Sequence, residues 1–318
     1  MRGTETMTMR ARPLALAALA ALALTSIAGC SSSDPLKATA SGTSGGDVTS
    51  VTVGSANFAE SELVMDLYGL ALEDAGLKVD YKPNIGARET YVAAVEDGSI
   101  DIVPDYTGNL LGYLDPDSTA TSREDVLAAL PAALPDTLSI LQPADAEDKD
   151  SLNVTEEFAT AHGLKTIADL AGAGHVRLGA NAEFEERPYG IPGLEKVYGV
   201  KDVDFVAIND GGGPNTVKAL TSGKVDVADI YTTTPAIAEN GLVTLEDPEN
   251  LIAAQNVVPL VATRVRTDTV TKALDAVSAQ LTTADLLAMN GRVSGDEKAD
   301  PKDVAKDWLV SKGLLTQG

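Results

Sequence analysis

The sequence is poor in cysteine, histidine, aromatic residues and positive charge, and each shortage argues against a class of function. Its 318 residues include one cysteine and two histidines, too few for a disulfide framework or a zinc site. Lysine and arginine number 24 against 47 acidic residues, and the resulting net charge of -23 would repel a phosphate backbone. We therefore expect no structural metal, no cofactor and no nucleic-acid partner.

What is present is a globular composition on a chain long enough for two lobes. Hydrophobic residues make up 44% of the chain and charged residues 22%, which is typical of a folded globular protein. Because domains usually run ~100–200 residues, 318 residues predict about two lobes. The apolar run 14–27 is shorter than the ~20 residues that a membrane-spanning helix needs.

The N-terminal segment 1–29 has the parts of a secretory signal. Three arginines precede the apolar run, and the small residues Ala28-Gly29 follow it. Together with Ile27 and Cys30 they resemble the bacterial lipobox, whose cysteine becomes the lipidated first residue of the mature protein. We expect a lipid anchor on Cys30 outside the cytoplasmic membrane; the alternative is an unpaired core thiol. The Ser-, Thr- and Gly-rich residues 30–47 predict a flexible tether.

Two stretches of the chain repeat at a constant offset of 125 residues without an insertion. This regularity indicates that each half contains the same supersecondary unit. The matching pairs are Val51-Thr52-Val53-Gly54 with Val176-Arg177-Leu178-Gly179, Gly86 with Gly211, Gly98-Ser99-Ile100-Asp101 with Gly223-Lys224-Val225-Asp226, and Tyr106-Thr107 with Tyr231-Thr232.

Each unit predicts alternating strands and helices, and therefore a parallel α/β sheet. In the first unit we expect a strand over 51–53, a helix that Asn57 and Glu60 begin with capping-box spacing, a helix over 88–97 and a strand over 100–103. Ligands gather beyond the carboxyl ends of such strands, so two units facing each other predict a cleft. We expect the glycines 211–213 to form a tight turn lining it, because no Lys-Ser/Thr follows them as in a phosphate loop.

At this point the sequence resembles the substrate-binding proteins of ABC importers for glycine betaine, choline and carnitine, over essentially all of 48–318. The residues that carry this resemblance are Val53-Gly54-Ser55, Asn57-Phe58, Glu60, Asn84-Ile85-Gly86, Gly98-Ser99-Ile100-Asp101, Pro104-Asp105-Tyr106-Thr107-Gly108, Phe184, Arg187, Gly190, Pro192-Gly193-Leu194, Tyr198-Gly199, Asp229, Tyr231, Leu245-Glu246-Asp247 and Val304-Ala305-Lys306-Asp307-Trp308-Leu309.

The resemblance implies an α/β, two-lobed periplasmic-binding-protein-like fold of type II. Each lobe would be a mixed, mainly parallel sheet flanked by helices, with the ligand in the cleft between the lobes. We expect lobe I to comprise 48–142 and 246–318, and lobe II 143–245. The implied function is capture of a small quaternary-ammonium osmoprotectant and its delivery to a permease with ATPase subunits. We expect the binding protein to be a monomer.

In this family aromatic faces hold the quaternary ammonium, which cannot donate hydrogen bonds, and Lys, Thr and Arg side chains hold a carboxylate. The sequence departs from that pattern. Ala56 stands where the Lys is expected, Asn109 replaces a Thr, and Ser151 and Gln255 are placed where two cage tyrosines usually are. The changes at Ala56, Ser151 and Gln255 leave open a second ligand class, a bulkier zwitterion or an aromatic compound.

Two arginines have competing interpretations. Arg88 is either a ligand-binding charge or a solvated helix-start residue paired with Glu89 or Asp101. Arg187 fits the anion-binding Arg of the family, or else it is a surface residue among neighbouring glutamates. The expected ligand-binding residues are Ala56, Asn57, Phe58, Arg88, Asp105, Tyr106, Thr107, Asn109, Ser151, Arg187, Tyr231, Thr232 and Gln255.

An enzyme is the weaker alternative. The sequence has no Gly-x-Ser-x-Gly elbow and no metal-ligand spacing, and both histidines lie outside the cleft motifs. A sensor or adhesion lipoprotein without a transporter has the same sequence features, and only neighbouring genes for a permease and an ATPase would separate it from an importer.

Overall fold

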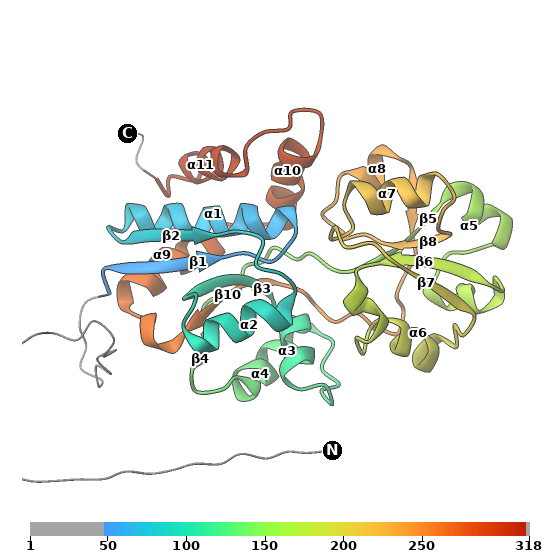
Figure 1. Cartoon of the computed structure of the whole chain (residues 1–318), viewed down its shortest axis with the longest axis horizontal. Coiled ribbons are helices and arrows are strands. Elements are labelled where there is room, and N and C mark those ends of the chain that lie inside the picture. The colour runs from blue at the N-terminus through green and yellow to red at the C-terminus, as the bar shows by residue number, and fades with distance from the viewer. Residues whose placement is uncertain (1–47, 316–318) are drawn as a thin grey trace, which may run out of the picture. The chain divides into compact units, whose positions relative to one another are not determined.

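The computed structural model describes residues 48–315, which form two five-stranded sheets flanked by helices (Figure 1). The predicted signal segment, Cys30 and the whole of the predicted tether lie outside these residues. Within residues 48–315, no helix is both long enough and apolar enough to cross a membrane.

The first sheet is mixed. Its strand order is β2-β1-β3-β10-β4, with β1 parallel to β2 and β3, and β10 antiparallel to β3 and β4. The five strands are β1 (Ser50–Gly54), β2 (Lys78–Lys82), β3 (Ile102–Tyr106), β4 (Leu138–Ile140) and β10 (Val257–Ala262). The chain therefore returns to this sheet after building the second one, because β10 lies between two strands from the first half.

Helices cover both faces of the first sheet. One face carries α1 (Ala59–Asp74), α9 (Asp268–Ser278), α10 (Thr283–Ser294) and α11 (Pro301–Ser311), and the other carries α2 (Arg88–Asp97), α3 (Thr107–Leu114) and α4 (Arg123–Ala133) (Figure 1). Several of these helices begin at side-chain caps: Ser122 for α4, Thr267 for α9, Thr282 with Asp285 for α10, and Asp300 for α11.

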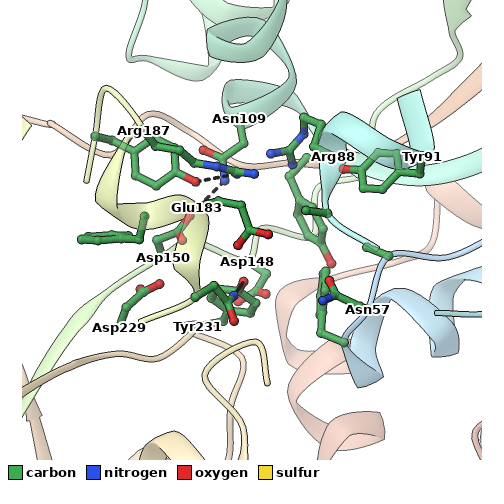
Figure 2. A pocket seen from close by; sticks show the side chains of 17 residues that line it. Asn57, Arg88, Tyr91, Asn109, Asp148, Asp150, Glu183, Arg187, Asp229 and Tyr231 are labelled. Atoms are coloured by element: carbon green, nitrogen blue, oxygen red, sulfur yellow. Dashed lines mark hydrogen bonds between the residues drawn. The ribbon is translucent and has the colours of Figure 1, made fainter. Parts of the chain in front are cut away.

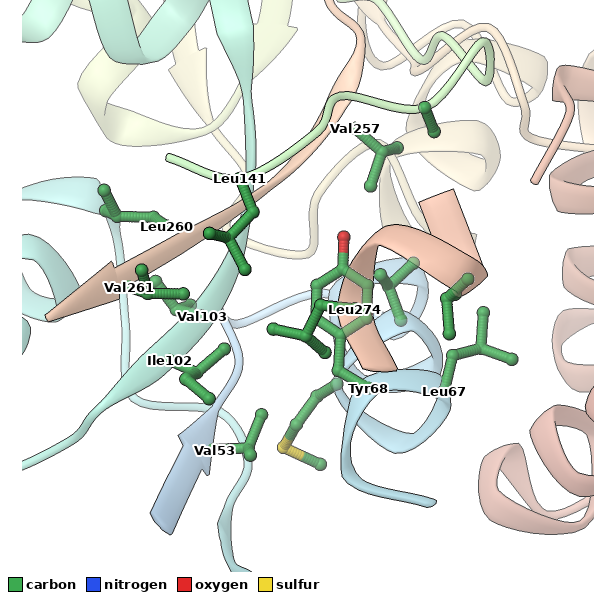
Figure 3. Close-up of a cluster of buried hydrophobic side chains, with 14 of the residues drawn as sticks. Val53, Leu67, Tyr68, Ile102, Val103, Leu141, Val257, Leu260, Val261 and Leu274 are labelled. Atoms are coloured by element: carbon green, nitrogen blue, oxygen red, sulfur yellow. The ribbon is translucent and has the colours of Figure 1, made fainter. Parts of the chain in front are cut away.

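The core of this lobe lies between the sheet and the α1 face. Figure 3 shows Tyr68 among Leu67, Leu274 and Val257, with Val53 and Ile102 of the sheet nearby. All of these side chains are buried, which is the burial expected for an apolar cluster that stabilises one lobe.

The second sheet repeats the parallel part of the first. Its strand order is β7-β6-β8-β5-β9, and β6 is parallel to both β7 and β8. Its strands are β5 (Leu152–Thr155), β6 (Val176–Ala180), β7 (Val203–Ala207), β8 (Val227–Asp229) and β9 (Leu242–Thr244). Its helices are α5 (Glu156–His162), α6 (Ile191–Tyr198), α7 (Pro214–Thr221) and α8 (Ala236–Glu239), with 3-10 turns η1 (Ile167–Gly172) and η2 (Ala182–Glu185); a third turn, η3 (Thr263–Val265), follows β10 in the first lobe.

The 125-residue repeat extends to individual hydrogen bonds. The Thr52 N–H donates to Oδ2 of Asp101 at 2.7 Å, and the Arg177 N–H donates to Oδ2 of Asp226 at 2.9 Å. Each aspartate follows a helix and satisfies a backbone donor of the neighbouring first strand. The two lobes therefore share this hydrogen bond from the backbone to an aspartate as well as the order of their elements.

Two connections join the sheets, between β4 and β5 and between β9 and β10. The lobe limits expected at 142/143 and 245/246 fall within these connections, and they stay predictions. Two local expectations were wrong. The third strand runs over Ile102–Tyr106 instead of 100–103, because its pairing with β10 continues to Tyr106. Helix α1 begins at Ala59 without a side-chain cap, so Asn57 and Glu60 form no capping box.

Candidate functional site

A cavity of about 70 Å³ lies where the strands of the two sheets end. Side chains reach it from the segments after β1, β3, β6 and β8, from the start of α2 and from the crossover between the sheets. It is lined by Ala56, Asn57, Phe58, Ala87, Arg88, Tyr91, Tyr106, Asn109, Asp148, Asp150, Asn181, Glu183, Phe184, Arg187, Tyr189, Asp229 and Tyr231 (Figure 2).

Aromatic side chains are concentrated in this pocket. Two of the four Phe and four of the eight Tyr of the chain line it. The ring of Phe58 lies 6.0 Å from that of Tyr106 and 5.3 Å from that of Tyr231, so residues from both repeats meet at one place. Ring faces grouped in this way can hold a cation without hydrogen bonds.

The two repeat-related tyrosines are fixed by their hydroxyls. Tyr106 donates to Oε1 of Glu60 at 2.7 Å, and Tyr231 accepts from Nδ2 of Asn181 at 3.1 Å. Burial raises the pKa of both phenols, which keeps them neutral. Close packing of Phe58 also depends on Gly211, which has a φ of 64° and where an added Cβ would lie 2.5 Å from the Phe58 Cβ. Gly211 therefore forms part of a tight turn beside the pocket, as expected.

Arg88 is buried, so the expectation of a solvated residue paired with Glu89 or Asp101 is wrong. Its side chain is 7% exposed, and its Nη2 lies 2.8 Å from Oδ1 of Asp105, whose side chain is fully buried. Nε donates to the same oxygen at 3.1 Å. Burial opposes the charge of the guanidinium, but the Asp105 carboxylate outweighs it and raises the pKa of Arg88.

Arg187 also reaches the pocket, and it is not a surface residue among glutamates. Its side chain is 20% exposed, and its Nη1 donates to the Tyr189 hydroxyl at 3.0 Å. Its Nη2 lies 3.3 Å from Glu89 of α2, a contact between the lobes. Figure 2 shows Arg187 and Arg88 on the same side of the pocket, with Asn109 between them. Two guanidinium groups together can bind a carboxylate.

Aspartate carboxylates also line the pocket. Asp148 accepts from the Thr233 N–H at 3.0 Å, and Asp150 accepts from Nδ2 of Asn109 at 2.9 Å. Asp229 is 2% exposed, and its Oδ1 has no hydrogen-bond partner within residues 48–315. Burial raises the pKa of Asp148, with Glu60 adding to the effect, and likewise that of Asp229, with Asp150 adding. A positive group in this pocket would stabilise the ionised form of both carboxyls.

Eight of the expected binding residues meet at the pocket, and five do not. Asp105 forms an ion pair with Arg88, and the Thr107 hydroxyl donates to the Ala254 carbonyl at 3.2 Å. The Thr232 hydroxyl donates to Asp148 at 3.2 Å. Ser151 donates to the Ile230 carbonyl at 2.5 Å, and Gln255 accepts from the Asn109 N–H at 2.9 Å and donates to its side chain at 2.6 Å. Ser151 and Gln255 therefore lie outside the lining of the pocket, with side chains bonded to backbone or to Asn109.

Several lining residues were missed as binding residues. Tyr91 lies one helical turn after Arg88 on α2, and Tyr189 lies two residues after Arg187, so spacing from an expected site residue could have suggested both. Asp148 and Asp150 lie in the crossover, which belongs to neither repeat, and no sequence pattern marked them. Within residues 48–315, no group of three or more His, Cys, Asp or Glu side chains is placed to hold a metal ion.

Comparison with known proteins gives a consistent picture. Residues 49–311 match the model of a family described as the substrate binding domain of ABC-type glycine betaine transport systems. The glycine betaine-binding protein YehZ of Escherichia coli K12 is 31% identical over 278 residues, which cover 83% of this chain and 90% of that protein.

Solved structures share the fold. The crystal structure of a glycine betaine/carnitine/choline ABC transporter aligns with a TM-score of 0.65 at 21% identity, covering 83% of this chain and 99% of that one. A choline-binding protein of an ABC transporter in complex with choline aligns with a TM-score of 0.64 at 18% identity, covering 84% and 89%. These likenesses confirm the expected two-lobed α/β fold.

Proposed function

Because this chain belongs to the family of substrate-binding domains of ABC-type glycine betaine transport systems, we propose that its pocket binds a small quaternary-ammonium osmoprotectant of the glycine betaine, choline or carnitine type. The family acts in transport outside the cytoplasm and not as an enzyme. Its partners are accordingly a small ligand and the permease and ATPase subunits of an importer.

The observation that carries the proposal is the composition of the pocket. Six aromatic rings and several carboxylates suit a cation that cannot donate hydrogen bonds, and desolvated cation–π contacts contribute up to ~2 kcal/mol each. Arg88 and Arg187 on the same side would receive the carboxylate of a zwitterion. This division of charge fits glycine betaine, whose ammonium and carboxylate are one methylene apart.

Delivery requires no covalent step. A ligand bound by both lobes favours the closed arrangement to the extent that it binds that arrangement more tightly than the open one. The contact between Arg187 and Glu89 and the bond from Asn109 to Asp150 join elements of the two lobes at the pocket, which supports such closure.

The other ligand class, a bulkier zwitterion or an aromatic compound, has less support. Of the three substitutions that suggested it, only Ala56 lines the pocket. Ser151 and Gln255 do not line it, and their side chains are hydrogen-bonded to the Ile230 carbonyl and to Asn109.

The mode of attachment is part of the proposal. The lipobox-like residues Ile27-Ala28-Gly29-Cys30 support a lipid anchor on Cys30, after removal of 1–29. Residues 30–47 would then tether a monomeric binding protein to the outer face of the membrane.

A thermal-shift series tests the ligand class. Glycine betaine, choline and carnitine should each raise the melting temperature, because a ligand at 100 times its Kd adds ~2.7 kcal/mol to the stability of the folded state. Glycine, which lacks the methyl groups, should not. Absence of a shift with every quaternary ammonium compound, together with a shift for an aromatic compound, would overturn the proposal.

Arg187→Gln separates the two ends of the ligand. It should weaken glycine betaine binding about tenfold, since a hydrogen bond to a charged group contributes ~1.5–3 kcal/mol. It should weaken choline binding much less, because choline has no carboxylate and loses only the lobe contact with Glu89. Arg123→Gln is the matched control, because Arg123 pairs with Asp145 at the surface. Equal losses of affinity for both ligands would show that Arg187 does not bind the carboxylate.

Binding of the cation should release protons. Burial raises the pKa of Asp148 and Asp229 in the free protein, so both bind protons above the ordinary value of 3.8. A neighbouring cation lowers these pKa values, and affinity therefore rises with pH over that range. Calorimetric titrations with glycine betaine in buffers of different ionisation enthalpy measure the release, which Asp229→Asn should reduce. Affinity that falls as pH rises would contradict this linkage.

A further inference from the structure

Glu60 is a buried acid that the proposed ligand contacts do not use. It is 5% exposed and is the second residue of α1, where a capping role was expected. Its carboxylate instead accepts three side-chain hydrogen bonds. Oε1 accepts from the Tyr106 hydroxyl at 2.7 Å, while Oε2 accepts from the Thr233 hydroxyl at 2.5 Å and from Nδ2 of Asn290 at 2.6 Å.

These partners come from both lobes. Tyr106 ends β3 and Asn290 belongs to α10, both in the first lobe, whereas Thr233 follows β8 of the second sheet. Nδ2 of Asn290 also lies 3.1 Å from the Thr233 hydroxyl and 3.2 Å from its carbonyl oxygen. Buried networks whose members are all satisfied specify one arrangement strongly. One carboxylate therefore connects a ring of the ligand pocket to the opposite lobe.

The charge on this carboxylate has no basic partner in contact. Within residues 48–315 no ion pair includes Glu60 or Asp148. Both acids bind Thr233: Glu60 accepts from its hydroxyl, and Asp148 accepts from its N–H at 3.0 Å. Arg88 and Arg187 are engaged by Asp105 and Glu89. Glu60 and Asp148 lie close together, so a cation in the adjacent pocket would be attracted to both.

A second cavity of about 380 Å³ lies on the far side of this network. Glu60, Asp148, Thr233 and Asn290 line it, and it shares Phe58, Asp148 and Tyr231 with the ligand pocket. Separation of the lobes would open the network to water from this cavity and rehydrate both acids.

We propose that Glu60 is a positioning residue that fixes the Tyr106 ring and, through Thr233, links the placement of that ring to closure of the lobes around the ligand. This inference rests on the proposed function for its ligand but not for its lobe contact. In this role Glu60 couples the placement of the Tyr106 ring to closure of the lobes and does not contact the ligand.

The first test measures binding by calorimetry with glycine betaine and choline. Glu60→Ala should weaken both about tenfold, and Glu60→Gln, which keeps an acceptor for Thr233, should recover most of that loss. Tyr106→Phe keeps the ring and removes the hydroxyl, so combining it with Glu60→Ala should cost no more than Glu60→Ala alone. Additive losses, or wild-type affinity in Glu60→Ala, would overturn the role of Glu60.

The second test needs no ligand. Small-angle X-ray scattering of the free protein should give a larger radius of gyration for Glu60→Ala and Thr233→Val than for the wild type, because each removes a contact between the lobes. Glu62→Gln is the matched control, since Glu62 lies on the same helix turn and its side chain accepts from Nδ2 of Asn84, in the same lobe, at 3.4 Å. Unchanged radii in both variants would overturn the lobe contact, whereas absence of betaine and choline binding in the wild type would overturn only the ligand class.

Discussion

Replacing Tyr231 by alanine is expected to weaken the binding of glycine betaine and choline about 30-fold. The Tyr231 ring lines the pocket, is half-buried and packs at 5.3 Å against Phe58, so it can offer a face that the bound cation would desolvate. A desolvated cation–π contact contributes ~2 kcal/mol, and ~1.4 kcal/mol corresponds to a factor of ten in Kd. Calorimetric titration of both ligands measures the change.

Two variants make this result specific. Tyr231→Phe keeps the ring and removes only the hydroxyl that accepts from Asn181, so its affinity should stay within about threefold of the wild type. Tyr113→Ala removes a tyrosine that is 37% exposed and lies outside the pocket, and should change nothing. If Tyr231→Phe lost as much affinity as Tyr231→Ala, the hydroxyl and not the ring face would bind the ligand.

Replacing Asp105 by alanine is expected to lower the free energy of unfolding by about 3–5 kcal/mol, the usual result of removing one partner of a buried ion pair. The change would leave Arg88 charged and buried without its acceptor. It would also remove the acceptor of the Tyr106 N–H, which donates to Oδ1 of Asp105 at 2.7 Å. Urea unfolding of the ligand-free protein measures the loss.

The control is an Arg–Asp ion pair that is exposed to solvent. Asp145→Ala breaks an ion pair with Arg123 in which Asp145 is 81% exposed, and exposed pairs contribute ~0–1 kcal/mol. In addition, Arg88→Met combined with Asp105→Leu should recover much of the stability, since no unpaired charge remains. Equal stability of Asp105→Ala and the wild type would contradict the importance of the buried pair.

Features that recur at the 125-residue offset could be predicted from the sequence, because both copies of the repeat have the same local sequence pattern. Tyr106 and Tyr231 were expected in the cleft and both line the pocket. Asp101 and Asp226 were matched by the repeat and make the same hydrogen bond. The helix expected over 88–97 has the bounds Arg88–Asp97.

Features that depend on contacts between distant segments could not be predicted. One interpretation paired Arg88 with Glu89 or Asp101, but the packing of α2 on β3 brings Asp105 to it. Capping-box spacing of Asn57 and Glu60 was misleading, because three buried donors compete more strongly for the Glu60 carboxylate than the helix start does.

The sequence by itself determined the two-lobed α/β architecture, its repeat and the transport family, since hydrophobic periodicity and local motifs are properties of neighbouring residues. Only the tertiary structure decided the content of the pocket: which tyrosines surround it, which arginines reach it, and that Asp148 and Asp150 of the crossover join Asp229 there. The physical reason is that burial and charge pairing are set by segments up to 230 residues apart, as between Glu60 and Asn290.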